Sequence, residues 1–278
     1  RANVESASYS FPTSSSRVTS IENISSRWGL RGSESLGGGM NAMFQLEAGF
    51  NVDTGAGGEI VLLNDPVGDA DQHALLMEFD SVHGRWRTPV AAGDGALVLN
   101  GQTIRLTHER TIEALPLAEL GVDLVIEAVA EDLALKQSIF RSLDDIVRPE
   151  AILATNTSSL SVTEIAVATR RPDRVLGMHF FNPVPVMRLL ELVRGLHTSD
   201  ETLAFARKVG AYLGKTTITA PDTPGFIVNR LLIPYVVEAI AAHETGLGSA
   251  EIMDSSVKLG MGHPLGPLAL ADLIGLDT

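Results

Sequence analysis

The sequence predicts an α/β protein, with a doubly wound, mostly parallel sheet followed by a small all-α domain. Short apolar runs alternate with helically spaced apolar residues from about residue 57 to residue 219, which is typical of a parallel sheet covered on both faces. Beyond Pro221 only helical spacing remains. At 278 residues, with 45% hydrophobic side chains, the chain can bury a sizeable core.

The first half of the sheet is predicted from two apolar segments. Glu59–Leu63 reads as a short buried strand, and Ala96–Leu106 reads as a hairpin around Asn100 and Gly101. Residues 1–36 are rich in serine and lack periodicity, so we expect a poorly ordered leader there.

The second half continues the alternation of strands and helices. Ser161 with Glu164 forms a capping box, and Thr198 with Glu201 is expected to cap the next helix. The predicted strands are 122–129, 151–155, 175–180, 189–193 and 216–219, and the predicted helices are 132–147 and the segment that ends at Gly214.

The chain is expected to divide near residue 220. Pro224 and Gly225 introduce a long helix, from Phe226 to about Glu244, with apolar spacing at Ile227, Leu231, Tyr235 and Ala239. Two further helices are predicted from Ser249 and Pro267. We therefore expect a sheet domain over 37–220 and a helical domain over 221–278.

Composition excludes several classes of function. The formal net charge of −13 argues against nucleic acid or an anionic membrane surface as the main partner. The absence of cysteine excludes disulfides, thiolate metal sites and a cysteine nucleophile; we expect no metal site and a reducing, cytoplasmic location. No apolar run reaches the roughly 18 residues that a membrane span needs.

Two polar residues in apolar strands are the candidate catalytic pair. His179 lies in a strand that leads into the turn Asn182–Pro185, and Glu191 lies between two leucines of the returning strand. A carboxylate in such a position is costly unless it is paired, and His179 is the natural partner. Each residue alone has a structural interpretation, as a satisfied core histidine or a solvated glutamate; together they suit proton transfer near neutral pH.

Four motifs carry a resemblance. TNTSSL from Thr155, GMHFFNPVPVM from Gly177, ELVRG from Glu191 and PGFIVNRLL from Pro224 stand in the order and spacing of the 3-hydroxyacyl-CoA dehydrogenase family. The sequence from about Val122 to its end resembles that family. The resemblance implies a Rossmann-like NAD domain, followed by a helical domain that is truncated relative to the family, and NAD-dependent oxidation of 3-hydroxyacyl-CoA in fatty acid metabolism.

The resemblance also implies roles for individual residues. His179 would be the general base and Glu191 its orienting partner, while Ser158 and Asn229 would bind the substrate oxygen and the surroundings of the histidine. Without the resemblance, Ser158 reads as a helix cap and Asn229 as an exposed helix residue. The residues that would contact NAD are Glu131, Lys136, Asn156 and Asn182.

The N-terminal half departs from this family. Gly37 and Gly39 begin a weak G-x-G-x-x-A pattern, without the hydrophobic strand that should precede a phosphate loop. The region from about 57 to 127 instead resembles the NAD-binding segment of glyceraldehyde-3-phosphate dehydrogenase, through motifs such as HALLMEFDSVHGRW from His73. That similarity implies that Asp65 binds the adenosine ribose, which would favour NAD over NADP; its structural interpretation is a turn residue before Pro66.

Several functional hypotheses follow. The leading one is an NAD-dependent 3-hydroxyacyl-CoA dehydrogenase, a homodimer through its helical domain, with acyl-CoA as substrate. The alternatives are a catalytically impaired dinucleotide-binding chimera and a related hydroxyacid dehydrogenase of the same fold, such as a gulonate dehydrogenase. Glyceraldehyde-3-phosphate dehydrogenase activity is excluded, because that reaction needs a cysteine nucleophile.

Overall fold

The computed structural model describes residues 33–35, 41–43, 47–53, 57–67, 69–80, 84–85, 89–99, 101–181, 184 and 187–274. Gly37, Gly39 and Asn182 lie outside these residues, as does nearly all of the expected leader.

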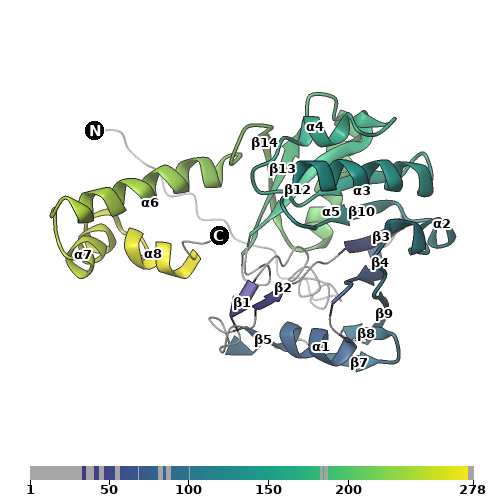
Figure 1. The fold of residues 1–278 in the computed structure, drawn as a ribbon, viewed down its shortest axis with the longest axis horizontal. Coiled ribbons are helices and arrows are strands. Elements are labelled where there is room, and N and C mark those ends of the chain that lie inside the picture. Colours follow the sequence, from purple (N-terminus) through teal and green to yellow (C-terminus); the bar gives the residue numbers. More distant parts are fainter. Residues whose placement is uncertain are drawn as a thin grey trace, which may run out of the picture.

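The central feature of the described fold is a ten-stranded sheet (Figure 1). Its strand order is β14-β13-β12-β11-β10-β3-β4-β9-β8-β7. The strands are β3 (Glu47–Asp53), β4 (Gly57–Asn64), β7 (Val90–Gly93), β8 (Ala96–Leu99), β9 (Gln102–Thr107), β10 (Leu124–Glu127), β11 (Ile152–Thr155), β12 (Val175–Phe180), β13 (Leu189–Arg194) and β14 (Thr216–Pro221). Two small separate ribbons are formed by β1 (Ser33–Ser35) with β2 (Asn41–Met43) and by β5 (Phe79–Asp80) with β6 (Gly84–Arg85).

The sheet is mixed, which corrects the expectation of a mostly parallel one. Strands β10, β11 and β12 are parallel, but β3 runs antiparallel to both β10 and β4. Strand β13 runs antiparallel to β12, because residues 181–188 between them are too few for a crossover connection. The predicted hairpin is confirmed as the antiparallel pair β8 and β9, in which Gly101 has a φ of 83°.

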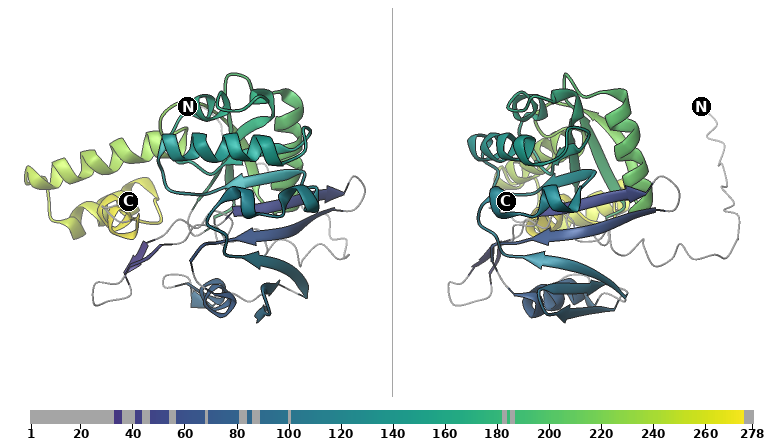
Figure 2. Two further views of the ribbon diagram at one scale, coloured as in Figure 1. Left: turned by 45° about the vertical axis from the view of Figure 1, so that its right-hand side comes forward. Right: turned by 90° about the vertical axis from the view of Figure 1, so that its right-hand side faces the viewer.

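Helices cover both faces of the sheet, so the doubly wound α/β class is confirmed (Figure 2). On one face the apolar core includes α5 (Asp200–Tyr212), with α1 (Ala70–Glu78) packed against it. On the other face it includes α3 (Leu133–Ile146) and α4 (Val162–Ala166). Shorter elements are η2 (Ile112–Ala114), α2 (Leu117–Leu120) and η3 (Pro172–Arg174).

Capping residues define where these helices begin. Asp132 accepts from the backbone N–H of Leu135 at the start of α3, and Ser161 accepts from that of Glu164 at the start of α4. The cap of α5 is Ser199 and not Thr198, which corrects the sequence prediction. Thr198 is buried, and its hydroxyl donates to the carbonyl of Val175 at 2.6 Å.

Three helices form the C-terminal part and project from one end of the sheet (Figure 1). They are α6 (Val228–Glu244), α7 (Ala250–Met261) and α8 (Pro267–Ile274). Both carboxylate oxygens of Asp254 in α7 accept backbone N–H groups at the start of α8, from Leu268 and Ala269. Leu231, expected on the packed face of α6, is 71% exposed, whereas Ala239 is buried. Among the described helices, none combines the length and apolar character of a membrane span.

Candidate active site

The candidate site lies at one edge of the sheet. Strands β10, β11 and β12 are parallel, so their carboxyl ends, at Glu127, Thr155 and Phe180, meet at the same edge. Open α/β sheets bind their ligands at this edge.

His179 and Glu191 face each other across β12 and β13. They are direct partners in the antiparallel register, so their side chains share one face of the sheet. The imidazole Nδ1 lies 2.7 Å from Oε2 of Glu191, and the two side chains are 4% and 0% exposed. Because an ionised carboxylate only accepts hydrogen bonds, it holds the proton on Nδ1 and leaves Nε2 able to accept one. The pairing inferred from the sequence is present.

The second oxygen of Glu191 binds the start of helix α6. Oε1 accepts the backbone N–H groups of Ile227, at 3.2 Å, and Val228, at 3.0 Å. These are among the N–H groups that a helix start leaves without intrahelical partners. One buried carboxylate therefore orients the histidine and caps the helix that carries Asn229.

Two aromatic rings enclose His179. The ring of Phe181 lies 4.5 Å from the imidazole centroid, and the ring of Phe226 lies 5.4 Å away, edge-on. Phe226 is 2% exposed, with a φ of 48° that phenylalanine rarely adopts. Sequence reasoning missed both residues, although each belongs to a motif that carries the family resemblance.

Asn156 connects the ends of β11 and β12. Its side-chain oxygen accepts the backbone N–H of Phe180 at 2.9 Å, and its backbone N–H donates to the carbonyl of Glu127 at the end of β10. Asn156 therefore lies next to the strand position that follows His179.

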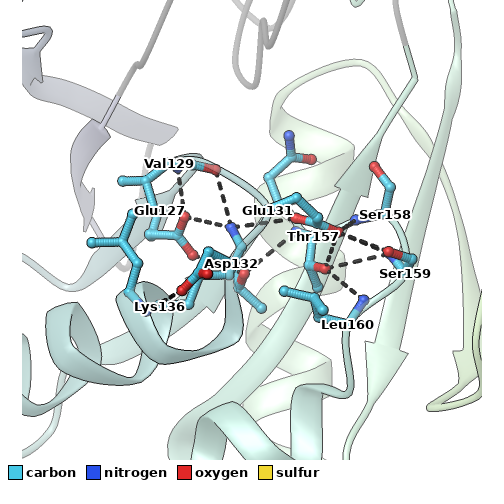
Figure 3. A network of polar contacts seen from close by, with 12 residues as sticks. Glu127, Val129, Glu131, Asp132, Lys136, Thr157, Ser158, Ser159 and Leu160 are labelled. Carbon is cyan, nitrogen blue, oxygen red and sulfur yellow. Dashed lines mark hydrogen bonds and ion pairs between the residues drawn. The ribbon is translucent and has the colours of Figure 1, made fainter. Parts of the chain in front are cut away.

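Glu131 organises the segment that follows Asn156 (Figure 3). Its Oε1 accepts the hydroxyl of Thr157 at 2.6 Å, the backbone N–H of Ser158 at 2.9 Å, and both the N–H and the hydroxyl of Ser159 at 3.1 Å. Burial would raise the pKa of Glu131, but these hydrogen bonds and the charge of Lys136 hold it below its usual range. Ser158 is exposed, and Asn229 is half-buried in the first turn of α6.

Lys136 is enclosed by protein oxygens (Figure 3). Its side chain is 1% exposed, and Nζ donates to Oε1 of Glu127 at 2.7 Å and to the carbonyl of Val129 at 3.3 Å. Oε2 of Glu131 lies 3.6 Å away. The predicted contact of Lys136 with NAD stays a prediction, because in this structure the ammonium group binds the chain's own oxygens.

Glu127 is a site-supporting residue that sequence reasoning missed. Its Oε1 accepts the backbone N–H of Val129 at 2.5 Å, and its Oε2 accepts the hydroxyl of Thr155 at 2.8 Å. The signal was available: a glutamate that ends an apolar strand needs a partner, which is the argument that singled out Glu191.

Asp65 lies in the turn before Pro66, as its structural interpretation from the sequence predicts. It follows β4, is 0% exposed, and Oδ1 accepts the backbone N–H of Val67 at 2.9 Å. Oδ2 lies 3.7 Å from Nε2 of His73, whose pKa is lowered chiefly by burial. The predicted binding of the adenosine ribose by Asp65 stays a prediction. In the described part of the chain, no cluster of histidine and carboxylate ligands suits a metal ion.

Comparison with known proteins places this arrangement in a family. Residues 87–223 match the NAD binding domain of 3-hydroxyacyl-CoA dehydrogenase, and residues 225–278 match its C-terminal domain. The chain belongs to the 3-hydroxyacyl-CoA dehydrogenase family. The match begins at residue 87, earlier than the Val122 expected from the sequence motifs. The resemblance of residues 57–127 to glyceraldehyde-3-phosphate dehydrogenase stays a prediction.

Individual relatives agree with this assignment. The chain is 54% identical over 156 residues to a probable 3-hydroxybutyryl-CoA dehydrogenase of Bacillus subtilis, covering 56% of this chain and 54% of the relative. It is 51% identical over 158 residues to the mitochondrial hydroxyacyl-coenzyme A dehydrogenase of Rattus norvegicus, covering 57% and 50%. The chain thus spans about half the length of the curated relatives it matches.

A solved structure resembles the fold as well. The (S)-3-hydroxybutyryl-CoA dehydrogenase PaaH1 of Ralstonia eutropha is 49% identical, with a TM-score of 0.58, over 63% of this chain and 60% of that one.

Proposed function

We propose that this chain oxidises the secondary alcohol of a (3S)-3-hydroxyacyl-CoA to a 3-oxoacyl-CoA with NAD, or catalyses the reverse reduction. The single observation that carries the proposal is the buried 2.7 Å contact between His179 Nδ1 and Glu191 Oε2. Membership of the family supports the proposal, because residues 87–223 match the family's NAD binding domain.

The proposed mechanism begins with proton transfer to His179. Nε2 of His179 accepts the hydroxyl proton of the substrate, and the carboxylate of Glu191 stabilises the imidazolium that forms. The rings of Phe181 and Phe226 limit access of water to the imidazole. In the reverse direction, the same Nε2 returns a proton to the carbonyl oxygen of the substrate.

NAD, when bound, supplies the hydride acceptor. The nicotinamide side of the site fits this cofactor, because Asn156 lies beside β12 and Glu131 holds the backbone of Ser158 at the carboxyl edge of the sheet. We propose that Asn156, Glu131, Lys136 and Asn182 hold that side, with Ser158 and Asn229 directed to the substrate oxygen. The adenosine side fits less well, because the carboxylate of Asp65 is fully buried. Gly37 and Gly39 remain the proposed phosphate loop.

The proposal is tested by NADH oxidation that depends on acetoacetyl-CoA. We expect wild-type activity and its loss in His179→Ala, because alanine cannot accept the hydroxyl proton. His197→Ala is the matched control, since His197 is exposed on the loop before α5. Activity in His179→Ala equal to that of the control would remove His179 from the mechanism. Replacing acetoacetyl-CoA by simple 3-oxoacids distinguishes the related hydroxyacid dehydrogenases, which use the same base.

The second candidate function is a catalytically impaired dinucleotide-binding module. The burial of Asp65 favours it, because a carboxylate enclosed in a turn cannot reach a ribose without rearrangement. Titration with NADH, followed by its fluorescence, separates the two. Binding without turnover supports the impaired module, whereas no binding at millimolar NADH rejects both functions.

We also propose that a second copy of this chain is the partner and that the chain is cytoplasmic. Large apolar side chains are exposed on the C-terminal helices, including Leu231, Val237, Ile252 and Leu259. Exposed apolar side chains on all of one group of helices favour association with a partner. Sedimentation of the wild type and of Val237→Glu tests the homodimer, and an unchanged sedimentation coefficient would reject this surface. Localisation is proposed from the lack of cysteine and is tested by cell fractionation.

A further inference from the structure

Asp222 lies in the linker between β14 and α6, outside the constellation described above. Its carboxylate accepts four hydrogen bonds from the start of α4. Oδ1 binds the backbone N–H of Val162 at 2.9 Å. Oδ2 binds the hydroxyl of Ser161 at 3.0 Å, together with the N–H of Thr163 at 2.8 Å and its hydroxyl at 2.5 Å.

Thr163 extends this contact to a third segment. Its hydroxyl oxygen, which donates to Asp222, also accepts the backbone N–H of Leu196 at 2.9 Å. The Asp222 carboxylate and the Thr163 hydroxyl, here called the linker clamp, therefore join the linker to α4 and to the loop that follows β13. β13 is the strand that carries Glu191.

The same linker delivers residues to the base. Only three residues separate Asp222 from Phe226, which packs edge-on against His179. The next two residues, Ile227 and Val228, donate their N–H groups to Glu191. A short displacement of the linker would therefore alter the Phe226 contact and both hydrogen bonds to Oε1 of Glu191.

The backbone of the linker needs external support. Gly225 and Phe226 have φ angles of 76° and 48°, and the second is unfavourable for a residue with a side chain. Such a conformation persists only where its surroundings fix it. Phe226 packs in a small apolar cluster that includes Val162, whose own N–H is bound by Asp222.

Capping of α4 is only part of what the clamp does. Ser161 accepts the N–H of Glu164, and Asp222 accepts those of Val162 and Thr163, but α4 has only five residues. The four bonds to Asp222 also include two side-chain hydroxyls and connect positions about sixty residues apart in the chain. They fix where the linker runs across the sheet.

We propose that Asp222 is a positioning residue of the active site. It acts through the linker, holding Phe226 against His179 and the first N–H groups of α6 against Glu191. The inference rests on the proposed function, because it assigns Asp222 to the same reaction.

The test compares Asp222→Asn with wild type and with Asp200→Asn, whose carboxylate is exposed. The amide presents a donor where the clamp needs an acceptor for Val162 or Thr163. We expect kcat with acetoacetyl-CoA to fall about ten-fold or more, since displacement of catalytic groups by about 1 Å is costly. The Kd for NADH should stay within about two-fold, because Glu131, and not Asp222, holds the segment that follows Asn156. Hydrogen exchange at the amides of Ile227 and Val228 should become faster.

A second pair of variants keeps the test decisive if Asp222→Asn fails to fold, which circular dichroism would reveal. Thr163→Val removes the hydroxyl of the clamp, whereas Thr163→Ser keeps it. We expect Thr163→Val to lower kcat in the same direction and Thr163→Ser to restore it.

Each outcome decides the proposal. Unchanged exchange at Ile227 and Val228, or an unchanged kcat in folded Asp222→Asn, overturns the positioning role. A parallel loss of NADH binding also overturns it, because the effect would then be general. If wild type shows no turnover, the proposed function fails; the exchange comparison still decides whether Asp222 fixes the start of α6.

Discussion

Glu191 divides its carboxylate between two partners, with Oε2 accepting from Nδ1 of His179 and Oε1 accepting from the N–H groups of Ile227 and Val228 at the start of helix α6. Both partners are donors when His179 is in the tautomer that leaves Nε2 free to accept a proton. The site therefore needs a group that accepts on both sides, which a carboxylate provides and an amide does not.

Replacement of Glu191 by glutamine tests this requirement. If the amide oxygen of the new glutamine accepts from His179, its NH₂ group faces the N–H groups of Ile227 and Val228, and donors then oppose donors. If the amide oxygen accepts from the helix, the NH₂ group donates to Nδ1 of His179 and favours the tautomer that carries the proton on Nε2. We expect kcat to fall by about 100-fold or more in Glu191→Gln, with NADH binding retained.

Glu201→Gln is the control for Glu191→Gln, since Glu201 is exposed on α5. Steady-state rates and an NADH titration measured on both variants make the comparison. Wild-type kcat in Glu191→Gln would show that orientation by a carboxylate is unnecessary.

The ion pair between Glu127 and Lys136 supports the cofactor edge, and its loss should destabilise the fold. Lys136→Met leaves the buried carboxylate of Glu127 without its cation. We expect the free energy of unfolding to fall by about 3–5 kcal/mol, as for other broken buried pairs. The double variant Glu127→Gln/Lys136→Met should recover part of this loss, because neither partner is then charged.

Urea unfolding of the wild type, the single variant and the double variant measures these changes. Equal destabilisation in the single and double variants would show that the penalty does not come from an uncompensated charge.

The sequence revealed part of this site for a physical reason. His179 and Glu191 could be paired because a charge inside an apolar strand is costly, and Glu127 was open to the same argument. Asp222 was not, because it lies in a linker between elements and its partners are about sixty residues earlier in the chain. Its role depends on tertiary proximity, which local patterns do not contain.

The fold was predictable to a similar degree. Alternation of strands and helices gave the α/β class and the covering of both faces. It could not show that β3 lies between β10 and β4 in antiparallel orientation, because no turn or crossover connects β3 to β10 directly. Helix α6 was predicted to begin at Phe226 but begins two residues later, at Val228, because the positive φ of Phe226 is not helical.

Lys215 should make stability depend on pH in alkaline solution. Its Nζ donates to the carbonyls of Val184 at 2.6 Å and Met187 at 3.0 Å, and burial lowers its pKa from 10.5 to about 8. Between these values the unfolded chain binds more protons at this residue than the folded chain, so its contribution to stability rises with pH. That contribution is present above pH 10.5 and is lost as the pH falls through about 8.

The variant Lys215→Met isolates this effect. We expect the difference in unfolding free energy, wild type minus variant, to increase between pH 7.5 and pH 9.5. Urea midpoints at the two pH values measure it, and Lys208→Met is the control because Lys208 is exposed on α5. A difference that does not change with pH would show that Lys215 keeps an ordinary pKa in the folded protein.

Gly177 should be intolerant of any side chain, because β12 packs closely there. A Cβ at this position would lie 2.7 Å from Cβ of Val193 and 3.0 Å from Cγ2 of Val162. Both neighbours are buried, so neither can move aside without disturbing the strand that carries His179. We expect Gly177→Ala to lower the free energy of unfolding by about 1–3 kcal/mol, the usual cost of overpacking.

Gly260→Ala supplies the opposite expectation for the same chemical change. Gly260 lies in helix α7, and nothing stands within 4 Å of the Cβ that the substitution adds. An alanine there should stabilise the protein by about 0.5–1 kcal/mol, because it restricts the unfolded chain and favours the helix. Thermal or urea unfolding of the two variants measures both changes in the free energy of unfolding. If Gly177→Ala were as stable as Gly260→Ala, the packing of Val193 and Val162 against Gly177 would not be close enough to exclude a side chain.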